Sequence, residues 1–192
     1  MDANRARQRW TYEDYARLPQ PSEARGTRFE VIDGDLHVTP SPSLRHQGIV
    51  TDLVTLLNVF VRSNRLGNVF VSPLDVIFGE GDYVEPDIVF VRSGREDILT
   101  KRGVEGPPDL LVEVLSPSTA ARDLGIKLDR YRLFGVTEYW VIDPDECTVL
   151  VWRLAEGANE PLALGWADTL RWRPLALGPL LEISVAELFR TQ

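Results

Sequence analysis

Apolar residues recur at spacings of three and four between Ser43 and Gly67, and this period predicts a long amphipathic helix. The helical pattern starts at Ser43, directly after Pro40 and Pro42 break the preceding segment. We expect Gly67 to cap the end of the helix, since glycine accepts the left-handed conformation common there. The face expected in the core consists of Ile49, Leu53, Leu56, Leu57, Phe60 and Val61.

Shorter apolar runs, rich in β-branched residues, predict strands before and after this helix. Residues 28–32 and 35–38 predict an N-terminal hairpin, because the Asp33-Gly34 pair between them is favoured in tight type I′ turns. Further strands are expected at 69–72, 74–78, 87–91 and 109–115, followed by a strand pair at 138–143 and 148–154.

Capping residues predict further helices. Thr11 with an acid, Asp14, three residues later is the signature of a helix start, so a short helix is expected near the N-terminus. The loop 116–119 ends in good capping residues, which predicts a second long helix over 120–134. We expect this helix to stop at Gly135.

The C-terminal part of the chain has a weaker pattern. Residues 156–183 read as irregular chain or short strands, followed by a C-terminal helix capped by Ser184. Strands interleaved with two long helices predict an α/β fold, in which helices flank a mixed central β-sheet. At this length, residues 1–192 are expected to form a single domain.

Composition narrows the possible functions and locations. The formal net charge of −8 and the pI of about 4.8 argue against a general electrostatic affinity for nucleic acid, although local basic patches remain possible. The single cysteine, Cys147, excludes an intramolecular disulfide, and no histidine stands at a catalytic spacing from it. Without an apolar run of membrane length or a secretory signal, we expect a cytoplasmic protein with no membrane partner.

Two acids lie within apolar runs that read as buried strands. Asp87 follows Pro86 at the start of one run, and Glu113 stands in the middle of another. A buried carboxylate is costly unless it is paired or bound to a metal, so both need a partner. Lys127 follows them and is one of only two lysines, against nineteen arginines. A divalent cation held by the acids, with this lysine nearby, would suit hydrolysis.

Each of these residues also has a purely structural interpretation. Asp123 and Lys127 are four apart on one helix, so an exposed ion pair of about 0.3 kcal/mol would explain both. Glu113 could pair with an arginine such as Arg122, and Asp87 could cap a loop. The tyrosine and tryptophans of the predicted strands, Tyr139, Trp140 and Trp152, are expected in the core or in a dimer interface.

The order of the acids and the lysine resembles the PD-(D/E)XK nuclease superfamily, which includes many restriction endonucleases. The segment 109–119 and the residues after it are similar to the Uma-type endonuclease family. This similarity spans about residues 28–154 and implies a restriction-endonuclease-like core. The residues after 119 that carry it are Asp123, Lys127, Tyr131 and 135–143.

The resemblance implies roles for individual residues. Asp87 and Glu113 match the superfamily acids that hold one or two Mg²⁺ ions, for which Mn²⁺ can substitute. The backbone carbonyl of Val114 corresponds to the usual additional ligand. Glu30 matches an early glutamate of the family, and His46 falls where the family has a histidine that opens the long helix.

The position of the lysine departs from the superfamily pattern. The superfamily lysine lies two residues beyond the strand acid, and Leu115 occupies that place here. Lys127 on the following helix therefore inherits the role of orienting the attacking water and offsetting charge on the phosphate. A buried lysine among cations could also have a lowered pKa and act as a general base.

The sequence thus supports two classes of function. The first is a magnesium-dependent endonuclease that hydrolyses phosphodiester bonds of nucleic acid, with DNA as the preferred expectation. The second is a non-catalytic protein that uses the nuclease fold for binding or assembly, which the acidic charge favours. A hydrolase of another phosphorylated substrate is a third alternative. We also expect a homodimer, because five tryptophans in a domain of this size predict an exposed apolar patch.

Overall fold

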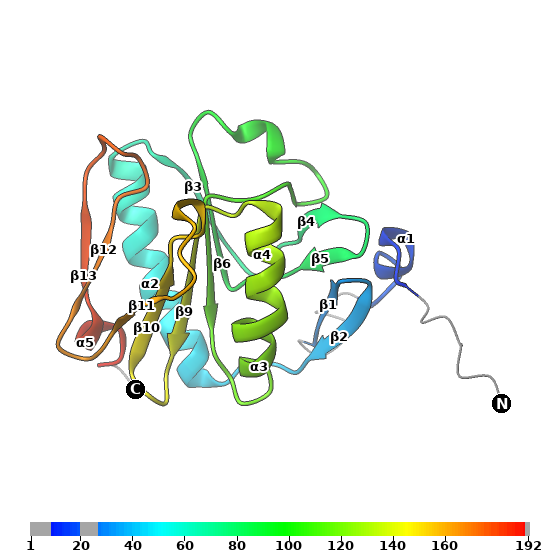
Figure 1. Cartoon of the computed structure of the whole chain (residues 1–192), viewed down its shortest axis with the longest axis horizontal. Coiled ribbons are helices and arrows are strands. Elements are labelled where there is room, and N and C mark those ends of the chain that lie inside the picture. The colour runs from blue at the N-terminus through cyan, green and yellow to red at the C-terminus, as the bar shows by residue number, and fades with distance from the viewer. Residues whose placement is uncertain (1–8, 20–26, 191–192) are drawn as a thin grey trace.

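The computed structural model describes residues 9–19 and 27–190, and a six-stranded mixed sheet forms its centre (Figure 1). The strand order is β11-β10-β9-β8-β6-β3. β8 and β9 run parallel, while the other neighbouring pairs are antiparallel. The strands are β3 (Gly67–Val71), β6 (Ile88–Arg92), β8 (Leu110–Val114), β9 (Glu138–Asp143), β10 (Thr148–Trp152) and β11 (Leu162–Leu164).

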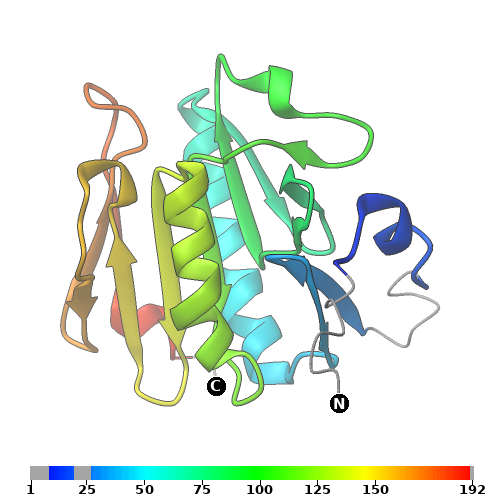
Figure 2. The ribbon, with the colours of Figure 1, turned by 45° about the vertical axis from the view of Figure 1, so that its right-hand side comes forward.

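Helices cover both faces of this sheet (Figures 1 and 2). The long helix α2 (Leu44–Ser63) packs on the face that includes Val112, and α4 (Leu128–Phe134) packs on the face that includes Leu111. Adjacent residues of a strand point to opposite faces, so a strand buried on both sides is apolar throughout. The predicted α/β fold, with a mixed sheet flanked by helices, is confirmed.

The second long helix is confirmed, but it contains a widened turn. It begins as α3 (Ala120–Arg122), continues as a π-helical segment (Asp123–Lys127) and ends as α4. Gly135 ends it in the left-handed conformation, with φ of 84°. The π-helical segment is the part that carries Lys127, and it therefore sets the direction of that side chain.

A five-stranded sheet lies beside the central one, in the order β2-β1-β5-β4-β7, and we call it the small sheet. Asp33 and Gly34 both have positive φ, at 50° and 81°, which confirms the predicted tight hairpin turn. β5 and β7, with three and two residues, were not predicted from the sequence. The strands are β1 (Arg28–Ile32), β2 (Asp35–Thr39), β4 (Val76–Gly79), β5 (Asp82–Val84) and β7 (Val104–Glu105).

The two ends of the chain add short elements. The first helix, α1 (Tyr12–Tyr15), has the predicted capping box between Thr11 and Asp14. At the other end, residues 156–183 form short strands, as expected, and Ser184 stands at the N-cap of the terminal helix. The C-terminal elements are β12 (Thr169–Trp172), β13 (Leu181–Ser184) and α5 (Val185–Leu188), and short 3₁₀ turns lie at Glu96–Ile98 and Leu154–Glu156.

Two details predicted for the long helix are wrong. The helix ends at Ser63, and Gly67 instead opens β3 with φ of 147°. A Cβ at Gly67 would lie 2.2 Å from the carbonyl oxygen of Val91, so close packing of two strands explains this glycine. Leu56 is 40% exposed, and Val50 is buried in the core.

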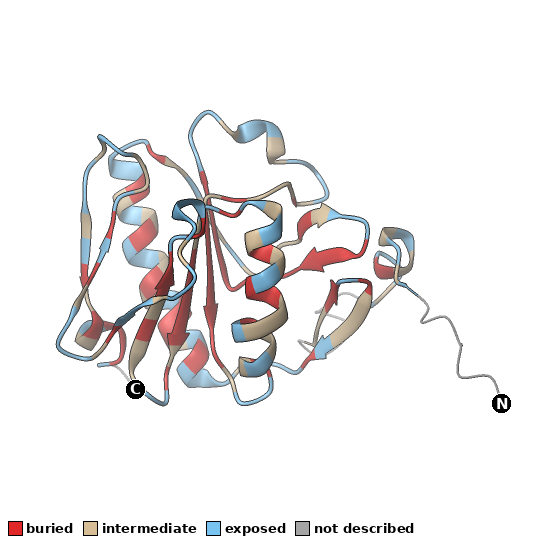
Figure 3. Cartoon of the chain, viewed as in Figure 1, coloured by how far each residue is buried: buried red, intermediate tan, exposed pale blue. Residues whose placement is uncertain are grey.

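Buried residues are concentrated on the strands of the central sheet (Figure 3), and the burial of large aromatic residues bears on the expected dimer. Trp140, Trp152 and Trp172 are buried in the core, as is Tyr139, which confirms the structural interpretation of the strand aromatics. Trp166 is half exposed. Burial of three tryptophans weakens the reasoning behind the homodimer, which stays a prediction. Among the described residues, no helix is both long and apolar enough to span a membrane.

Candidate active site

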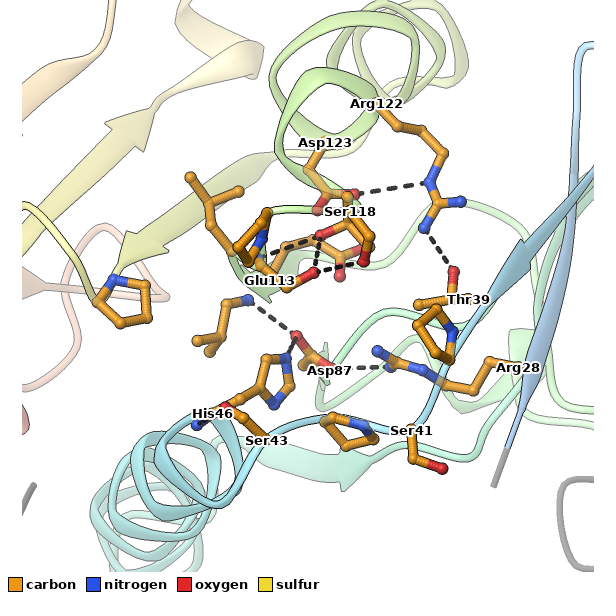
Figure 4. Close-up of a pocket in the computed structure, with 18 of the residues that line it drawn as sticks. Arg28, Thr39, Ser41, Ser43, His46, Asp87, Glu113, Ser118, Arg122 and Asp123 are labelled. Atoms are coloured by element: carbon orange, nitrogen blue, oxygen red, sulfur yellow. Dashed lines mark hydrogen bonds and ion pairs between the residues drawn. The ribbon is translucent and has the colours of Figure 1, made fainter. Parts of the chain in front are cut away.

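The residues that the sequence assigned to the site line one cavity of about 280 Å³. The cavity lies where the end of β2, the start of α2, the end of β8 and the start of α3 meet (Figure 4). The structure therefore brings together residues that are up to 97 positions apart in the chain, from 30 to 127. These residues are Glu30, His46, Asp87, Glu113 and Lys127, with Val114 beside them.

Lys127 lies at the centre of a group of carboxylates. Its Nζ atom is 2.7 Å from Oε1 of Glu30, 2.7 Å from Oε1 of Glu113 and 3.5 Å from Oδ1 of Asp123. The lysine is only 2% exposed. The interpretation of Asp123 and Lys127 as an exposed ion pair is therefore wrong, because the pair is buried and shares the ammonium with two more acids.

These carboxylates fix the charge of Lys127. Burial by itself lowers the pKa of a lysine, but Glu113, Glu30 and Asp123 outweigh this effect and raise the pKa well above its ordinary value. Lys127 therefore carries a positive charge at every physiological pH. The possibility that it acts as a general base with a lowered pKa is not supported by this geometry.

The fold fixes the position of the lysine through the widened helical turn. A π-helical segment disturbs the regular hydrogen bonding of a helix, and such segments frequently lie at functional sites. Here the hydroxyl group of Tyr139 donates a hydrogen bond to the backbone carbonyl of Asp123, at 3.1 Å. Tyr131, one turn after Lys127, donates to Oε1 of Glu113 at 3.2 Å. Two tyrosines from the core thus support the helix and the carboxylate.

Asp87 is surrounded by hydrogen-bond donors. Nη1 of Arg28 donates to its Oδ1 atom at 2.8 Å, while Nε2 of His46 and the backbone N–H of Val114 approach its Oδ2 atom at 3.0 and 2.8 Å. Burial raises the pKa of this carboxyl, but the hydrogen bond from His46 and the charge of Arg28 outweigh burial and lower it. Asp87 is therefore an ionised, buried group, and it does not merely cap a loop.

Glu30 connects the hairpin to the lysine. Its Oε1 atom accepts the backbone N–H of Glu85 at 3.0 Å in addition to Lys127, and its Oε2 atom is 3.2 Å from Nη2 of Arg122. Burial raises the pKa of Glu30, but Lys127 and Arg122 together lower it below its ordinary value. Arg122 thus pairs with Glu30 and not with Glu113, contrary to the alternative that the sequence left open.

The carboxylates of the cavity outnumber the permanent cations around them. Burial, together with the neighbouring acids Asp123, Asp87 and Glu30, raises the pKa of Glu113 to about 8, although Lys127 opposes this rise. The Oδ1 atom of Asp123 is buried and accepts no hydrogen bond from the described residues. The carboxylates are Glu30, Asp87, Glu113 and Asp123, and the cations are Arg28, Arg122 and Lys127.

This surplus of carboxyl groups over cations fits a hard divalent cation, because a bound cation favours the ionised form of an acid such as Glu113. Carboxylate and carbonyl oxygens are the ligands that Mg²⁺ prefers, and the ion keeps several waters of its own. Within residues 9–19 and 27–190, no three histidine, cysteine or acidic side chains are grouped closely enough to hold a metal. Any metal here would thus rely on two carboxylates, a backbone carbonyl and water.

The sequence model of the Uma2 family, which is described as "Putative restriction endonuclease", matches residues 12–185. The chain belongs to the Uma2 family. Among solved structures, it is similar to a crystal structure described as "a putative nuclease belonging to DUF820" from Anabaena variabilis ATCC 29413. The two share 24% sequence identity and a TM-score of 0.76, over 94% of this chain and 98% of that chain, which shows a common fold. No curated protein matches the chain.

Three residues of this Uma2 cavity were not assigned a role at the site by sequence reasoning. Arg28 pairs with Asp87, while Arg122 pairs with Glu30 and hydrogen-bonds Thr39 at 2.7 Å. Asp123 was noted only for its spacing from the lysine. The available signal was the alternation of β1, which places Arg28 two residues before Glu30 and hence on the same face of the strand.

Proposed function

We propose that this protein is a magnesium-dependent nuclease that hydrolyses phosphodiester bonds of nucleic acid, with DNA as its substrate. The observation that carries the proposal is the convergence of Asp87, Glu113 and Lys127 on one cavity, with 2.7 Å between the lysine and Glu113. Membership of the Uma2 family supports it, since the description of that family is "Putative restriction endonuclease". The crystal structure with the same fold is described as "a putative nuclease".

The residues that would hold the ion are Asp87, Glu113 and the backbone carbonyl of Val114. The surplus of carboxyl groups in the cavity supports this assignment, as does the hard-oxygen character of the donors. Bound Mg²⁺, or Mn²⁺ in its place, would polarise the scissile phosphate and lower the pKa of a bound water. Arg28 and His46 hold Asp87 through its two oxygens, so they position this carboxylate for its role.

Lys127 supplies a fixed positive charge next to the reacting phosphate. Since three carboxylates keep it protonated, it offsets negative charge that develops in the transition state and orients the attacking water by donating hydrogen bonds. Glu30 is a positioning residue, because it contacts the lysine and Arg122 from the side of the hairpin. Arg122 adds a second cation to the cavity.

The test is metal-dependent cleavage of DNA and RNA by the wild type and by Lys127→Arg. We expect wild-type cleavage of DNA with Mg²⁺ or Mn²⁺, and a loss of at least about 100-fold in the variant, typical of removing one preorganised donor. An arginine keeps the charge, but its larger planar group cannot direct three donors from one nitrogen to Glu30, Glu113 and Asp123, as the ammonium does.

Lys101→Arg is the matched control, because Lys101 is the other lysine of the chain and is exposed. It should cleave like the wild type. Thermal melting of both variants separates lost chemistry from lost folding. A wild type that cleaves no nucleic acid with either metal would contradict the proposal and favour a non-catalytic binding role for the fold.

A further inference from the structure

The groups proposed to act on the phosphate lie at the bottom of the cavity. Asp87, Glu113 and Lys127 are 2%, 3% and 2% exposed. A cavity of about 280 Å³ is close to the lower limit for ligand pockets, roughly 300 Å³. It can therefore admit a group about the size of a nucleotide. A phosphate must enter this cavity to meet the proposed ligands, whereas the backbone of a stiff duplex stays on its outer surface.

The rim of the cavity is built to keep its width. It is formed by three segments, 39–43, 116–119 and 144–145, and each contains proline, which fixes its own φ. Arg45, in the first turn of α2 directly after the first segment, ties this helix to the third segment, since its side chain binds Oδ1 of Asp145 at 3.1 Å and the carbonyl of Pro144.

The other segments of the rim are also held in place. Arg122 donates to Oγ1 of Thr39 at 2.7 Å, which ties the end of β2 to the helix that follows the second segment (Figure 4). Within that second segment, the hydroxyl groups of Ser116, Ser118 and Thr119 lie within 3.1 Å of one another in two pairs. A rim with these cross-links resists the widening that a duplex backbone would need.

Charge on the rim also disfavours a duplex. Arg45 is part-exposed, but it is paired with Asp145, which is 77% exposed. Duplex DNA carries one negative charge per about 1.7 Å of its axis, about twice the density of one of its strands, so it depends more on basic groups and is repelled more by an acid. The chain has a net charge of −8, and this exposed acid faces any backbone that approaches the rim.

We infer that the substrate is single-stranded at the point of cleavage, as in a free strand, a flap or a gap. The reasons are the depth of the proposed catalytic groups in the cavity, the rigid rim and the charge on the rim. The inference rests on the proposed nuclease function. A flexible strand turns one phosphodiester into the cavity at little cost, whereas a paired strand must first lose pairing and stacking, at a few kcal/mol.

The experiment compares cleavage of one DNA sequence as a free strand, as a blunt duplex and as a duplex with a single-stranded flap. With Mg²⁺ or Mn²⁺, we expect the free strand and the flap to be cut at least tenfold faster than the duplex, with flap cuts confined to unpaired nucleotides. Equal or faster cutting inside the blunt duplex would overturn the inference and leave the nuclease proposal intact. A wild type inert on all three substrates would overturn both.

A rim variant tests the proposed cause. Pro42→Gly combined with Pro117→Gly should loosen two rim segments and at least halve the preference for single strands. Pro161→Gly, outside the cavity, is the control and should keep the wild-type preference. Circular dichroism checks that both remain folded. An unchanged preference in the folded double variant would show that the rim does not select the strand.

Discussion

Two neighbouring groups of buried or half-buried acids differ in whether cations form ion pairs with them. In the first, Lys127 and two arginines pair with the acids of the cavity. In the second, the hydroxyl group of Tyr15 lies 2.6 Å from Oδ1 of Asp75 and 3.4 Å from Oε1 of Glu85. Among the described residues, no lysine, arginine or histidine forms an ion pair with Asp75 or Glu85. The backbone N–H of Glu85 links the two groups by binding Glu30.

The difference shows in the pKa values of the acids. Burial raises the pKa of Asp75, and burial together with Asp75 raises that of Glu85 to about 7. Glu30 and Asp87 are at least as deeply buried, yet neighbouring cations lower their pKa values. Burial alone thus favours neutral acids. Glu30 and Asp87 stay ionised because the chain supplies cations to them, whereas the pKa of Glu113 stays raised although Lys127 contacts it.

The largest effect is expected from removing the lysine. Lys127→Met leaves three buried carboxylates without their shared cation, and breaking a buried pair in this way costs about 3–5 kcal/mol. An exposed ion pair between Asp123 and Lys127 would instead predict a loss of well under about 1 kcal/mol. Urea unfolding measures the loss. Lys101→Met, at the exposed lysine, is the control, and its stability should stay within about 0.5 kcal/mol of the wild type. If Lys127→Met were as stable as Lys101→Met, the cation of the cavity would not be needed to compensate its acids, and the difference between the two groups of acids would disappear.

The next effect concerns Glu85 and depends on pH. The folded pKa of about 7 lies above the ordinary 4.5, so the unfolded chain ionises first as the pH rises. Burying this carboxyl therefore does not reduce the stability of the folded protein below about pH 4, but it reduces that stability progressively as the pH rises to 7. The free energy of unfolding of Glu85→Gln should equal that of the wild type at pH 4. At pH 8 it should be higher than that of the wild type by up to about 3 kcal/mol.

Thermal or urea unfolding across this pH range measures the difference between Glu85→Gln and the wild type. Glu160→Gln, at an exposed acid, is the control and should give no trend. A Glu85→Gln curve parallel to that of the wild type would mean that Glu85 is ionised in the folded protein, and the contrast with the cavity would then fail.

The smallest effect, but the most specific, is on metal affinity. Asp87→Asn with Glu113→Gln should weaken Mg²⁺ binding by more than about 100-fold, since even second-sphere changes reach that size. Asp75→Asn with Glu85→Gln removes two acids nearby and should leave the affinity unchanged. Calorimetry with Mg²⁺ compares the two double variants. Equal affinities in both would mean that the metal does not bind at Asp87 and Glu113.

Much of the fold could be predicted from the sequence, because hydrophobic periodicity and helix capping depend on residues that are close together in the chain. The hairpin around Asp33 and Gly34 and the helix from residue 44 are of this kind. β5 and β7 were missed, since two or three residues show no period and their pairing is set by partners distant in the chain. Gly67 was misassigned, because its cause is the approach of Val91 from another strand.

The candidate site, too, could be predicted from the sequence only in part. Acids in apolar runs can be identified from sequence, so Asp87 and Glu113 were found. Their cations come from other elements. The alternation of β1 places Arg28 on the face of Glu30, but nothing local indicates that Arg122 turns inward. Glu85 stands two residues before Asp87, yet it joins the other acid group. Sequence indicates which charges are buried, but tertiary packing decides which of them are paired.

The π-helical segment has a consequence for how this chain can vary. Deleting one residue within it would restore a regular helix, but each residue turns a helix by about 100°, so Lys127 would leave its carboxylates. Leu124 in the same segment is 39% exposed, so its side chain has room to change. The segment is therefore constrained in length more than in composition, and an insertion or deletion there is a more damaging event than most substitutions.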